Sequence, residues 1–497
     1  MKRFLSVFLC LAMVFAMTLG IGTRQAEAAP DEDFFVRIGL YFMSTAVTEV
    51  TVVSNDGFIL ASVDRHGFEE IQDLRNYTSL IIEYSGGKAV VYDMGDNVVL
   101  DSVDQNVALI SAADDPDSRI VSVNGTKYRD GVIAAAYTTG PKLAVANYVT
   151  LEHYLWGVVP AEMGYQYGAE ALKAQAVCAR SFTLANLEKH GGGALSFDLC
   201  SKTHCQAYNG VEKEKDSTTK ACVDTAGEIM TYNGSVITAY YHAYNGGYTL
   251  DPEDVWSTKL GYLKSTRDEY TGLHVWNTSF TFDELSSILA GYELGKIKAV
   301  KVGKRLANGA VQELVIEGSA KNVTLSKNTI ISTLNLKSRW FSVLANGYGQ
   351  VALPTGSGQQ SSDSSDPVVE AYFASSGASG SSVLGGASLL TVVSSSGISE
   401  ITVSDMKVYN GKNTYGLLDD ARSSDSKSDD AGSGAAEFSD EVASNGVVYL
   451  SGIGYGHGVG LCQTGANNMA SKGFDYTEIL DYYYTDIFLE DLSGAGF

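Results

Sequence analysis

The sequence predicts an α+β fold that is rich in β-strands, with a few helices that carry the reactive residues. Short apolar runs broken by Asn-Asp-Gly or Gly-Gly turns fill the N-terminal part, as in TVVS-NDG-FILASV and SLIIEYS-GG-KAVVYDM, and this spacing is typical of β-hairpins. From about Glu152 the apolar residues recur every three or four positions, which indicates helices. We therefore expect a small N-terminal β-rich domain followed by a larger domain of strands and helices.

The chain of 497 residues divides into five predicted segments. Residues 1–28 resemble a signal peptide, because Lys2 and Arg3 precede an apolar run and Ala26-Glu27-Ala28 has the form of a cleavage site. An uncleaved membrane anchor is the alternative, since the apolar run is almost long enough to span a bilayer. The other segments are an N-terminal β-rich domain over 34–118, the larger domain over 119–353, a flexible Ser/Gly/Asp-rich insertion over 354–445, and the end of the larger domain over 446–490.

Charge and cysteine content exclude two classes of protein. The net charge of -23 argues against nucleic acid as a partner, because such proteins concentrate Lys and Arg on one face. Removing Cys10 with the signal peptide leaves five cysteines, and an odd number argues against a full disulfide framework.

One carboxylate stands inside the mostly apolar run VVPAEMGYQYGAEALKAQAVCARSF, residues 158–182. We expect helices over 152–159 and 168–190, with Glu162 in the turn between them. A carboxyl near Trp156, Val159 and Met163 would be poorly solvated and would stay protonated at neutral pH, as a general acid acting on a glycosidic oxygen must be. A solvent-facing turn glutamate is the alternative, which the residues of this run leave open.

The stretch FDLCSKTHCQAYNG, residues 197–210, brings together possible metal ligands. Cys200, His204 and Cys205 lie within six residues, and His190 lies upstream of them beyond three glycines. Two thiolates and two imidazoles form a feasible tetrahedral zinc site. A disulfide between Cys200 and Cys205 is the alternative in an exported protein, and both remain open at this point.

Two glycine-containing motifs carry the remaining candidate residues. In ITAYYHAYNGGYTLDPEDVW, a tight Asn-Gly-Gly turn would present His242, Asn245 and Thr249 along one rim. In GIGYGHGVGLCQTGA, glycines around His457 and Gln463 would let the backbone approach a ligand closely. The spacing of a phosphate-binding loop is absent from this second motif.

Five motifs in order resemble the SpoIID/LytB family, that is, stage II sporulation protein D and its amidase-enhancer relatives of Gram-positive bacteria. They are LEHYLWGVVPAEM, GAEALKAQAVCARSF, CSKTHCQAYNG, YYHAYNGGYT and GYGHGVGLCQTGA, within residues 128–342 and 447–488. The resemblance implies an exported lytic transglycosylase, located at the extracellular face of the membrane or in the cell wall of a Gram-positive bacterium. It would cleave denuded peptidoglycan strands between N-acetylmuramic acid and N-acetylglucosamine and leave 1,6-anhydro ends, in sporulation or wall remodelling.

The resemblance also implies roles for individual residues. Glu162 matches the catalytic position, and a single acid suffices because the muramyl 6-hydroxyl replaces water as the nucleophile. Arg180, Tyr262 and Lys264 would line the glycan groove. Zinc becomes the favoured reading for His190, Cys200, His204 and Cys205, as a structural ion that the chemistry does not require. Tyr248 and Trp256 are candidate sugar-stacking aromatics.

The alternative from another class is a non-catalytic amidase enhancer or wall-binding module, whose groove holds glycan while a partner amidase cuts. The retained acid in PAEM favours the transglycosylase. The chain departs from the family pattern at Gly164, where proline is common, and at Cys462, where serine is common. The glycine would loosen the turn beside the acid.

Overall fold

The protein is described here by a computed structural model. It covers residues 33–101, 106–138, 140–191, 195, 197–272, 274–348 and 440–495, together with the backbone of four strands between 389 and 416. The predicted signal peptide and most of the predicted insertion lie outside the described residues. The architecture is α+β and β-rich, as the sequence predicts. Within the described residues, no helix has both the length and the apolar character that crossing a bilayer requires.

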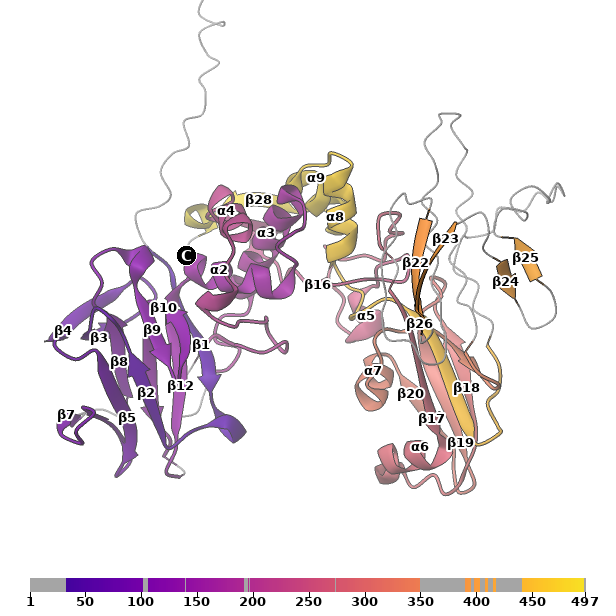
Figure 1. The fold of residues 1–497 in the computed structure, drawn as a ribbon, viewed down its shortest axis with the longest axis horizontal. Coiled ribbons are helices and arrows are strands. Elements are labelled where there is room, and N and C mark those ends of the chain that lie inside the picture. The colour runs from indigo at the N-terminus through magenta and orange to yellow at the C-terminus, as the bar shows by residue number, and fades with distance from the viewer. Residues whose placement is uncertain are drawn as a thin grey trace, which may run out of the picture. The chain divides into compact units, whose positions relative to one another are not determined.

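The N-terminal part is a sandwich of two β-sheets (Figure 1). One sheet has the order β13-β1-β12-β11-β8-β3-β4 and the other β10-β9-β2-β5-β6-β7. Alternate residues such as Val50 and Val52 of β2, and Leu80 and Ile82 of β5, are buried between the sheets, as the period of a strand requires. The strands are β1 (Phe35–Tyr41), β2 (Glu49–Val53), β3 (Phe58–Val63), β4 (Phe68–Leu74), β5 (Ser79–Ser85), β6 (Lys88–Tyr92), β7 (Val98–Asp101), β8 (Asn106–Ser111), β9 (Ile120–Val123), β10 (Thr126–Arg129), β11 (Gly131–Ala136), β12 (Leu143–Thr150) and β13 (Leu199–Cys200).

The sandwich continues beyond the predicted domain boundary at residue 118. Strands β9 to β12 pair with β1, β2 and β8, so the N-terminal part extends to Thr150. Local strand patterns identify hairpins but do not tell which sheet a strand joins, so they do not reveal that strands on the two sides of residue 118 pair with each other.

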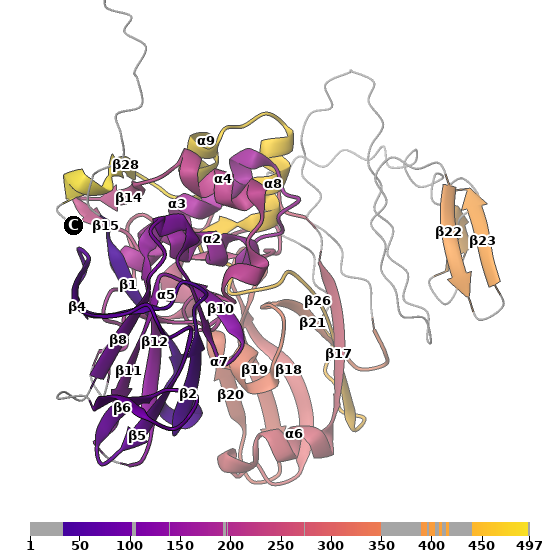
Figure 2. The same cartoon turned by 60° about the vertical axis from the view of Figure 1, so that its left-hand side comes forward.

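Helices from the middle and from the C-terminal end of the chain form one group beside the sandwich (Figures 1 and 2). The helix α3 lies in its centre and packs against the other four. Thirteen of its seventeen residues are buried, so α3 is a core helix rather than a surface helix. The group comprises α2 (Leu151–Glu162), α3 (Ala169–Ala185), α4 (Asp216–Asp224), α8 (Gln463–Ser471) and α9 (Tyr476–Tyr483).

The helix α2 is longer than the sequence predicts. It begins after Thr150, whose hydroxyl accepts a hydrogen bond from the N–H of His153, and it continues past Pro160 to Glu162. The expectation that Glu162 lies in the turn between two helices was therefore wrong. Proline fits the helical φ angle and removes only one backbone bond, so a single further turn is tolerated.

A second β-rich part has its own apolar core. It contains the sheets β17-β26-β21 and β18-β19-β20, covered by two short helices. Smaller sheets, β15-β14-β28 and β16-β27, connect to the helical group. The elements are β14 (Glu228–Tyr232), β15 (Ser235–Val236), β16 (Tyr241–His242), α5 (Pro252–Val255), β17 (Val275–Thr281), α6 (Phe282–Ile288), β18 (Ile297–Arg305), β19 (Val311–Gly318), β20 (Val323–Ser326), α7 (Asn328–Leu334), β21 (Trp340–Leu344), β26 (Val447–Ile453), β27 (Leu461–Cys462) and β28 (Phe488–Asp491).

The chain leaves and re-enters this second part at one point. The N–H of Glu441 donates to the carbonyl of Val343 over 2.8 Å, and the carboxylate of Glu441 accepts from the N–H of Ala345 over 2.7 Å. Val343 and Ala345, which precede the predicted insertion, are therefore directly hydrogen-bonded to Glu441, which lies near its predicted end. Residues 354–435 form a separate unit, whose described strands make two hairpins, β22 (Leu389–Ser394) with β23 (Gly397–Thr402) and β24 (Lys407–Tyr409) with β25 (Thr414–Gly416).

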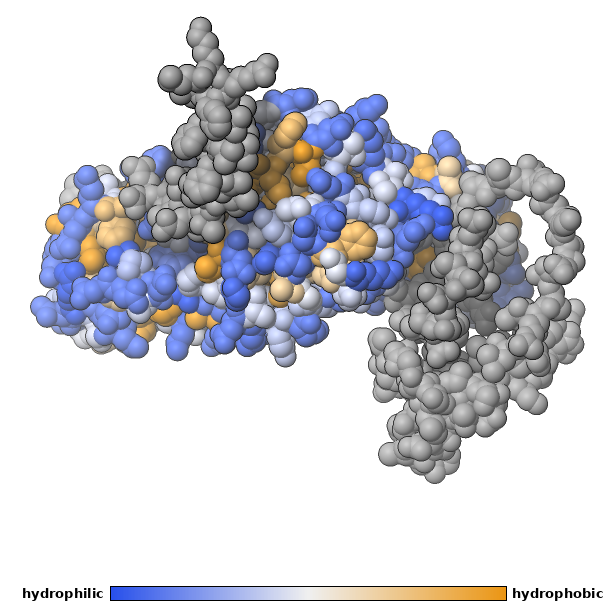
Figure 3. Space-filling view, turned by 90° about the horizontal axis from the view of Figure 1, so that it is seen from above, coloured by the Kyte–Doolittle hydropathy of each residue, from blue (hydrophilic) through white to orange (hydrophobic). Residues whose placement is uncertain are grey.

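The face of the molecule seen in Figure 3 is mostly hydrophilic, with apolar residues in small separate patches. This agrees with the acidic composition of the chain.

Candidate functional site

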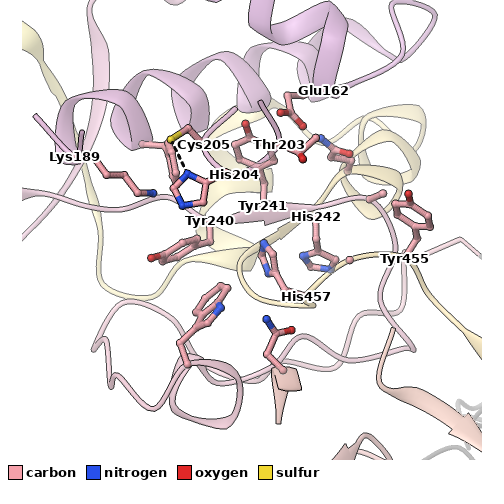
Figure 4. Close-up of a pocket in the computed structure, with 16 residues that line it drawn as sticks. Glu162, Lys189, Thr203, His204, Cys205, Tyr240, Tyr241, His242, Tyr455 and His457 are labelled. Carbon is pink, nitrogen blue, oxygen red and sulfur yellow. Dashed lines mark hydrogen bonds between the residues drawn. The ribbon is translucent and has the colours of Figure 1, made fainter. Parts of the chain in front are cut away.

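A cavity of about 650 Å³ lies where the helical group meets the strands β16 and β27. Figure 4 shows Glu162, His204 with Cys205, and His242 with His457 around the same space. A volume of this size is typical of a small-molecule or oligosaccharide site. The lining residues are Glu162, Phe182, Lys189, Thr203, His204, Cys205, Tyr240, Tyr241, His242, Ala243, Trp256, Asn328, Tyr455, Gly456, His457 and Gln463.

Glu162 enters the cavity from the last residue of α2. Its Oε1 accepts a hydrogen bond from the backbone N–H of Ala207 over 2.5 Å. Burial raises the pKa of the Glu162 carboxyl, and the hydrogen bond from Ala207 offsets only part of that rise. The protonated acid therefore persists to higher pH than in an exposed glutamate, while the N–H of Ala207 is placed to stabilise the carboxylate once the proton has left.

The loop beneath Glu162 is fixed by Gln206, which is fully buried. The side-chain amide of Gln206 donates to the hydroxyl of Tyr241 over 3.2 Å, and its carbonyl accepts from the hydroxyl of Thr183 over 2.9 Å. These bonds tie the loop to α3 and to β16. Because Ala207 is the next residue, its N–H has a defined direction toward Glu162.

The four predicted metal ligands are together. One ligand atom from each of His190, Cys200, His204 and Cys205 lies within 4.8 Å of all the others. The Sγ of Cys205 is 3.2 Å from Nε2 of His190 and 3.4 Å from Nδ1 of His204, and the Sγ of Cys200 is 3.7 Å from the same Nδ1. Neighbouring ligands of a tetrahedral zinc ion lie about 3.6 Å apart, so these separations fit such an ion.

The five described cysteines are unpaired, so Cys200 and Cys205 are two thiols in contact. Their contact favours one thiolate and one thiol, because the hydrogen bond from Cys205 lowers the pKa of Cys200 to about 4 and the same bond raises the pKa of Cys205. An easily ionised thiol beside two imidazoles is the donor set that zinc prefers.

A parallel pairing joins the last two motifs. Tyr241 and His242 of β16 pair with Leu461 and Cys462 of β27, and this pairing brings His242, His457 and Gln463 to one side of the cavity. Burial lowers the pKa of His242 to about 3 and that of His457 to about 4, so both imidazoles are neutral at neutral pH.

The two imidazoles present different ring nitrogens as donor and acceptor. Nδ1 of His242 lies 3.1 Å from the carbonyl of Val459 and therefore carries the proton, and its buried Nε2 has no hydrogen-bond partner in the structure. Nδ1 of His457 instead accepts from the N–H of Val459 over 3.0 Å. His242 thus offers the lone pair of Nε2 to a bound hydroxylated ligand, whereas His457 is hydrogen-bonded to the backbone of both Val459 and Tyr241.

Aromatic rings form the cavity wall beside His457. The rings of Tyr240 and Trp256 have centroids 4.6 Å apart, and Trp256 lies 5.0 Å from the ring of His457. Trp256 remains 37% exposed, so its face is open to a ligand. Flat apolar faces beside polar groups suit the amphipathic faces of a sugar ring.

Five predicted groove residues do not line the cavity. Arg180 is fully buried on α3 and donates two hydrogen bonds to the carboxylate of Glu152, over 2.7 and 2.8 Å. Asn245 donates to the carboxylate of Asp268, and Thr249 donates to the backbone carbonyl of Lys264, whose own side chain is exposed elsewhere. Tyr262 is buried and its hydroxyl accepts from the N–H of Thr238. The side chains of Arg180, Asn245, Thr249 and Tyr262 thus have structural partners and do not line the cavity.

The sequence missed several lining residues, of which Tyr240, Tyr241 and Lys189 are the most informative. Tyr240 and Tyr241 directly precede His242, and Lys189 directly precedes His190, so each adjoined a residue already chosen. The pairing of β16 with β27, which no local pattern reveals, is what places the tyrosines on the wall. Of the two aromatics suggested for stacking, Trp256 lines the cavity and Tyr248 does not.

The fold and the cavity define an α+β protein with one buried acid in a polar, aromatic-lined pocket. The SpoIID family model, described as stage II sporulation protein, matches residues 139–232 of this chain. An uncharacterized protein of Brachyspira hyodysenteriae is 25% identical over 76% of this chain and 75% of its own length. The amidase enhancer of Bacillus subtilis is 28% identical over 66% of this chain and 39% of its own length. Stage II sporulation protein D of Bacillus amyloliquefaciens is 26% identical over 47% of this chain and 72% of its own length. These matches confirm the resemblance to the SpoIID/LytB family.

Proposed function

We propose that this protein is an exported peptidoglycan lytic transglycosylase. Its substrate is a denuded glycan strand, which it cleaves between N-acetylmuramic acid and N-acetylglucosamine to leave a 1,6-anhydro end. The observation that carries the proposal is that Glu162 is the one Asp or Glu among the described residues that line the cavity. A hydrolase of the usual kind needs a second carboxylate near the first, whereas a transglycosylase that uses the sugar's own hydroxyl does not.

The geometry supports a two-step use of the same acid. Protonated Glu162 gives its proton to the glycosidic oxygen as the bond from that oxygen to the muramyl anomeric carbon breaks. The muramyl 6-hydroxyl then bonds to the anomeric carbon and transfers its proton to the Glu162 carboxylate. The N–H of Ala207 stabilises that carboxylate between the steps, and Glu162 ends the cycle protonated.

The neutral imidazoles and the aromatic wall would hold the strand. The free Nε2 of His242 would accept a hydrogen bond from a sugar hydroxyl, and Trp256 would contact an apolar sugar face. Gln463 also lies on the cavity wall. Its side-chain Nε2 donates to the side-chain oxygen Oε1 of Gln175 over 3.2 Å, and this bond orients the side-chain amide of Gln463.

We further propose that His190, Cys200, His204 and Cys205 hold a structural zinc ion. The fit rests on the mutual approach of four donor atoms. The ion would fix the loop that ends at Ala207, and so would stabilise the position of the acid without taking part in the reaction.

The test is a product analysis. Incubating the mature protein with denuded strands should yield 1,6-anhydro ends by mass spectrometry, and Glu162→Gln should abolish them while the variant keeps its fold. Reducing ends would mean hydrolysis and would overturn the proposal.

The second candidate is an amidase enhancer that binds glycan while a cell-wall amidase cuts. It is favoured by the match over 66% of this chain to a protein of that name. Absence of any cleaved product, with a faster amidase reaction on addition of this protein and of Glu162→Gln alike, would establish it instead.

A further inference from the structure

Lys189 is the one lysine or arginine among the described residues that line the cavity. Figure 4 shows its side chain reaching from the end of the α3 region toward His204. Its Nζ lies over the ring of Phe182, 5.5 Å from the centroid, and none of the ion pairs of the described residues includes it. A cation in this position is available to an anionic group of a ligand.

The backbone around Lys189 is anchored on both sides. The N–H of Glu188 donates to the buried carboxylate of Asp198 over 3.0 Å, and Glu188 itself has a positive φ of 59°. On the other side, His190 pairs with Phe197 in an isolated bridge. The two neighbours fix the backbone at Lys189, and its exposed side chain lines the cavity.

The positive charge of Lys189 determines which ligand groups it can bind. The chain carries a net charge of -23, which repels a polyanionic strand, and the one carboxyl on the cavity wall has a raised pKa that keeps it protonated more readily. Each muramyl residue of a strand without stem peptides ends its lactyl ether in a free carboxylate. In a strand with stem peptides the same carboxyl is an uncharged amide. A lone cation in the cavity therefore distinguishes the two strands by charge.

We propose that Lys189 binds a muramyl lactyl carboxylate and thereby selects strands that lack stem peptides. The inference rests on the proposed function, since it deepens the account of the same site. The two cations that the resemblance placed in the glycan groove do not compete for this role, because the guanidinium of Arg180 is paired with Glu152 and Lys264 does not line the cavity.

The experiment compares binding of three glycans to Glu162→Gln, which removes turnover. The glycans are denuded strands, the same strands with their lactyl carboxyls converted to methylamides, and N-acetylglucosamine oligomers without lactyl groups. We expect tighter binding of the free-carboxylate strands, and we expect Lys189→Ala in this background to remove about 5- to 10-fold of that affinity while leaving the other two glycans unchanged. Lys189→Arg should retain the preference.

Lys220 offers a matched control, because it is exposed on α4, pairs with Asp224 and lies off the cavity. Lys220→Ala should bind all three glycans as the parent does. Equal affinity of the parent for free and amidated strands would overturn the inference, as would an equal loss for all glycans in Lys189→Ala. Failure to bind any strand would overturn it as well.

Wild-type turnover separates this inference from the proposed function. Cleavage by the wild type with no charge preference would leave the transglycosylase standing and remove the role of Lys189. A charge preference that depends on Lys189, without any cleavage, would remove the transglycosylase and leave Lys189 as a determinant of glycan binding.

Discussion

The backbone N–H of Ala207 donates to the carboxyl of Glu162 across 2.5 Å. This bond joins the end of α2 to a loop that carries Cys205 only two residues earlier. The position of the acid therefore depends on the conformation of the cysteine-containing loop, and the proton affinity of the acid depends on the balance between burial and this one bond.

The raised pKa of Glu162 predicts how the protein responds to pH. Burial is the larger effect, so the folded state holds this proton more tightly than the unfolded chain, and loss of the proton as pH rises lowers the free energy of unfolding. Glu162→Gln should therefore lose less stability than the wild type as pH rises above the ordinary glutamate value of 4.5 in urea unfolding experiments. Parallel stability curves for the two proteins would contradict this reading.

Cleavage should depend on the same proton. We expect kcat/KM on denuded strands to fall with rising pH, with an apparent pKa above the usual glutamate value of 4.5, and Glu162→Gln to lower the rate by at least about 100-fold. A rate that rises through this range would mean that the carboxylate, rather than the acid, acts first.

Arg180 should matter for stability. It is buried, its guanidinium forms a two-point ion pair with Glu152, and it also donates to the carbonyl of Glu228 over 3.0 Å. Arg180→Ala leaves these acceptors without their donor and should lower the free energy of unfolding by about 3–5 kcal/mol. Lys220→Ala, which removes an exposed pair on α4, should change it by less than about 1 kcal/mol. A stable Arg180→Ala that has lost only glycan binding would contradict the structural role.

Removal of the proposed zinc should loosen the loop that contacts the acid. The purified protein should contain about one zinc per chain, and Cys205→Ser or His190→Asn should lower that content. Amide hydrogen exchange of residues 205–208 should become faster in both variants, because Cys205 no longer anchors the segment before Ala207. Cys178→Ser changes a buried thiol away from the cluster and should keep its metal.

His153 predicts a second pH dependence, at the start of α2. Its Nδ1 lies 2.9 Å from a carboxylate oxygen of Asp130, and its Nε2 lies 3.1 Å from Asp117. Burial lowers the pKa of His153, but the hydrogen bonds and charges of Asp130 and Asp117 together outweigh it and leave the pKa above 6.5. The stabilisation is complete below the unfolded value and is lost as pH rises through the folded one. His153→Gln should therefore flatten the decline in stability as pH rises above 6.5, as measured by urea unfolding.

Local patterns predicted the kinds of element correctly, because hairpin turns and helical periods are short-range signals. They placed α3 within a few residues and the cluster of His190, Cys200, His204 and Cys205 in one region. They did not identify strand partners, so the pairing of strands before residue 118 with strands after it could not be predicted from the sequence.

The predicted site residues also fall into two groups, those that line the cavity and those that do not. Glu162, His242, His457 and Gln463 all line the cavity, Glu162 from the end of α2 and the other three from segments that the pairing of β16 with β27 brings together. Arg180, Tyr262, Asn245 and Thr249 are in motifs but face buried partners, because polar side chains inside a domain must satisfy their hydrogen bonds locally. Which of two adjacent polar residues faces a cavity depends on packing between distant segments.

The hydrogen bond between Glu441 and Val343 has a consequence for how such proteins diversify. The chain leaves the sheet after Val343 and returns to it at Glu441, and these two residues are directly hydrogen-bonded. A segment of any length can therefore be inserted, removed or exchanged between them without changing the distance between its attachment points. Replacing 354–435 with a short Gly/Ser linker should accordingly preserve the melting temperature of the remainder. The same junction offers a practical graft point for a reporter or a wall-targeting domain.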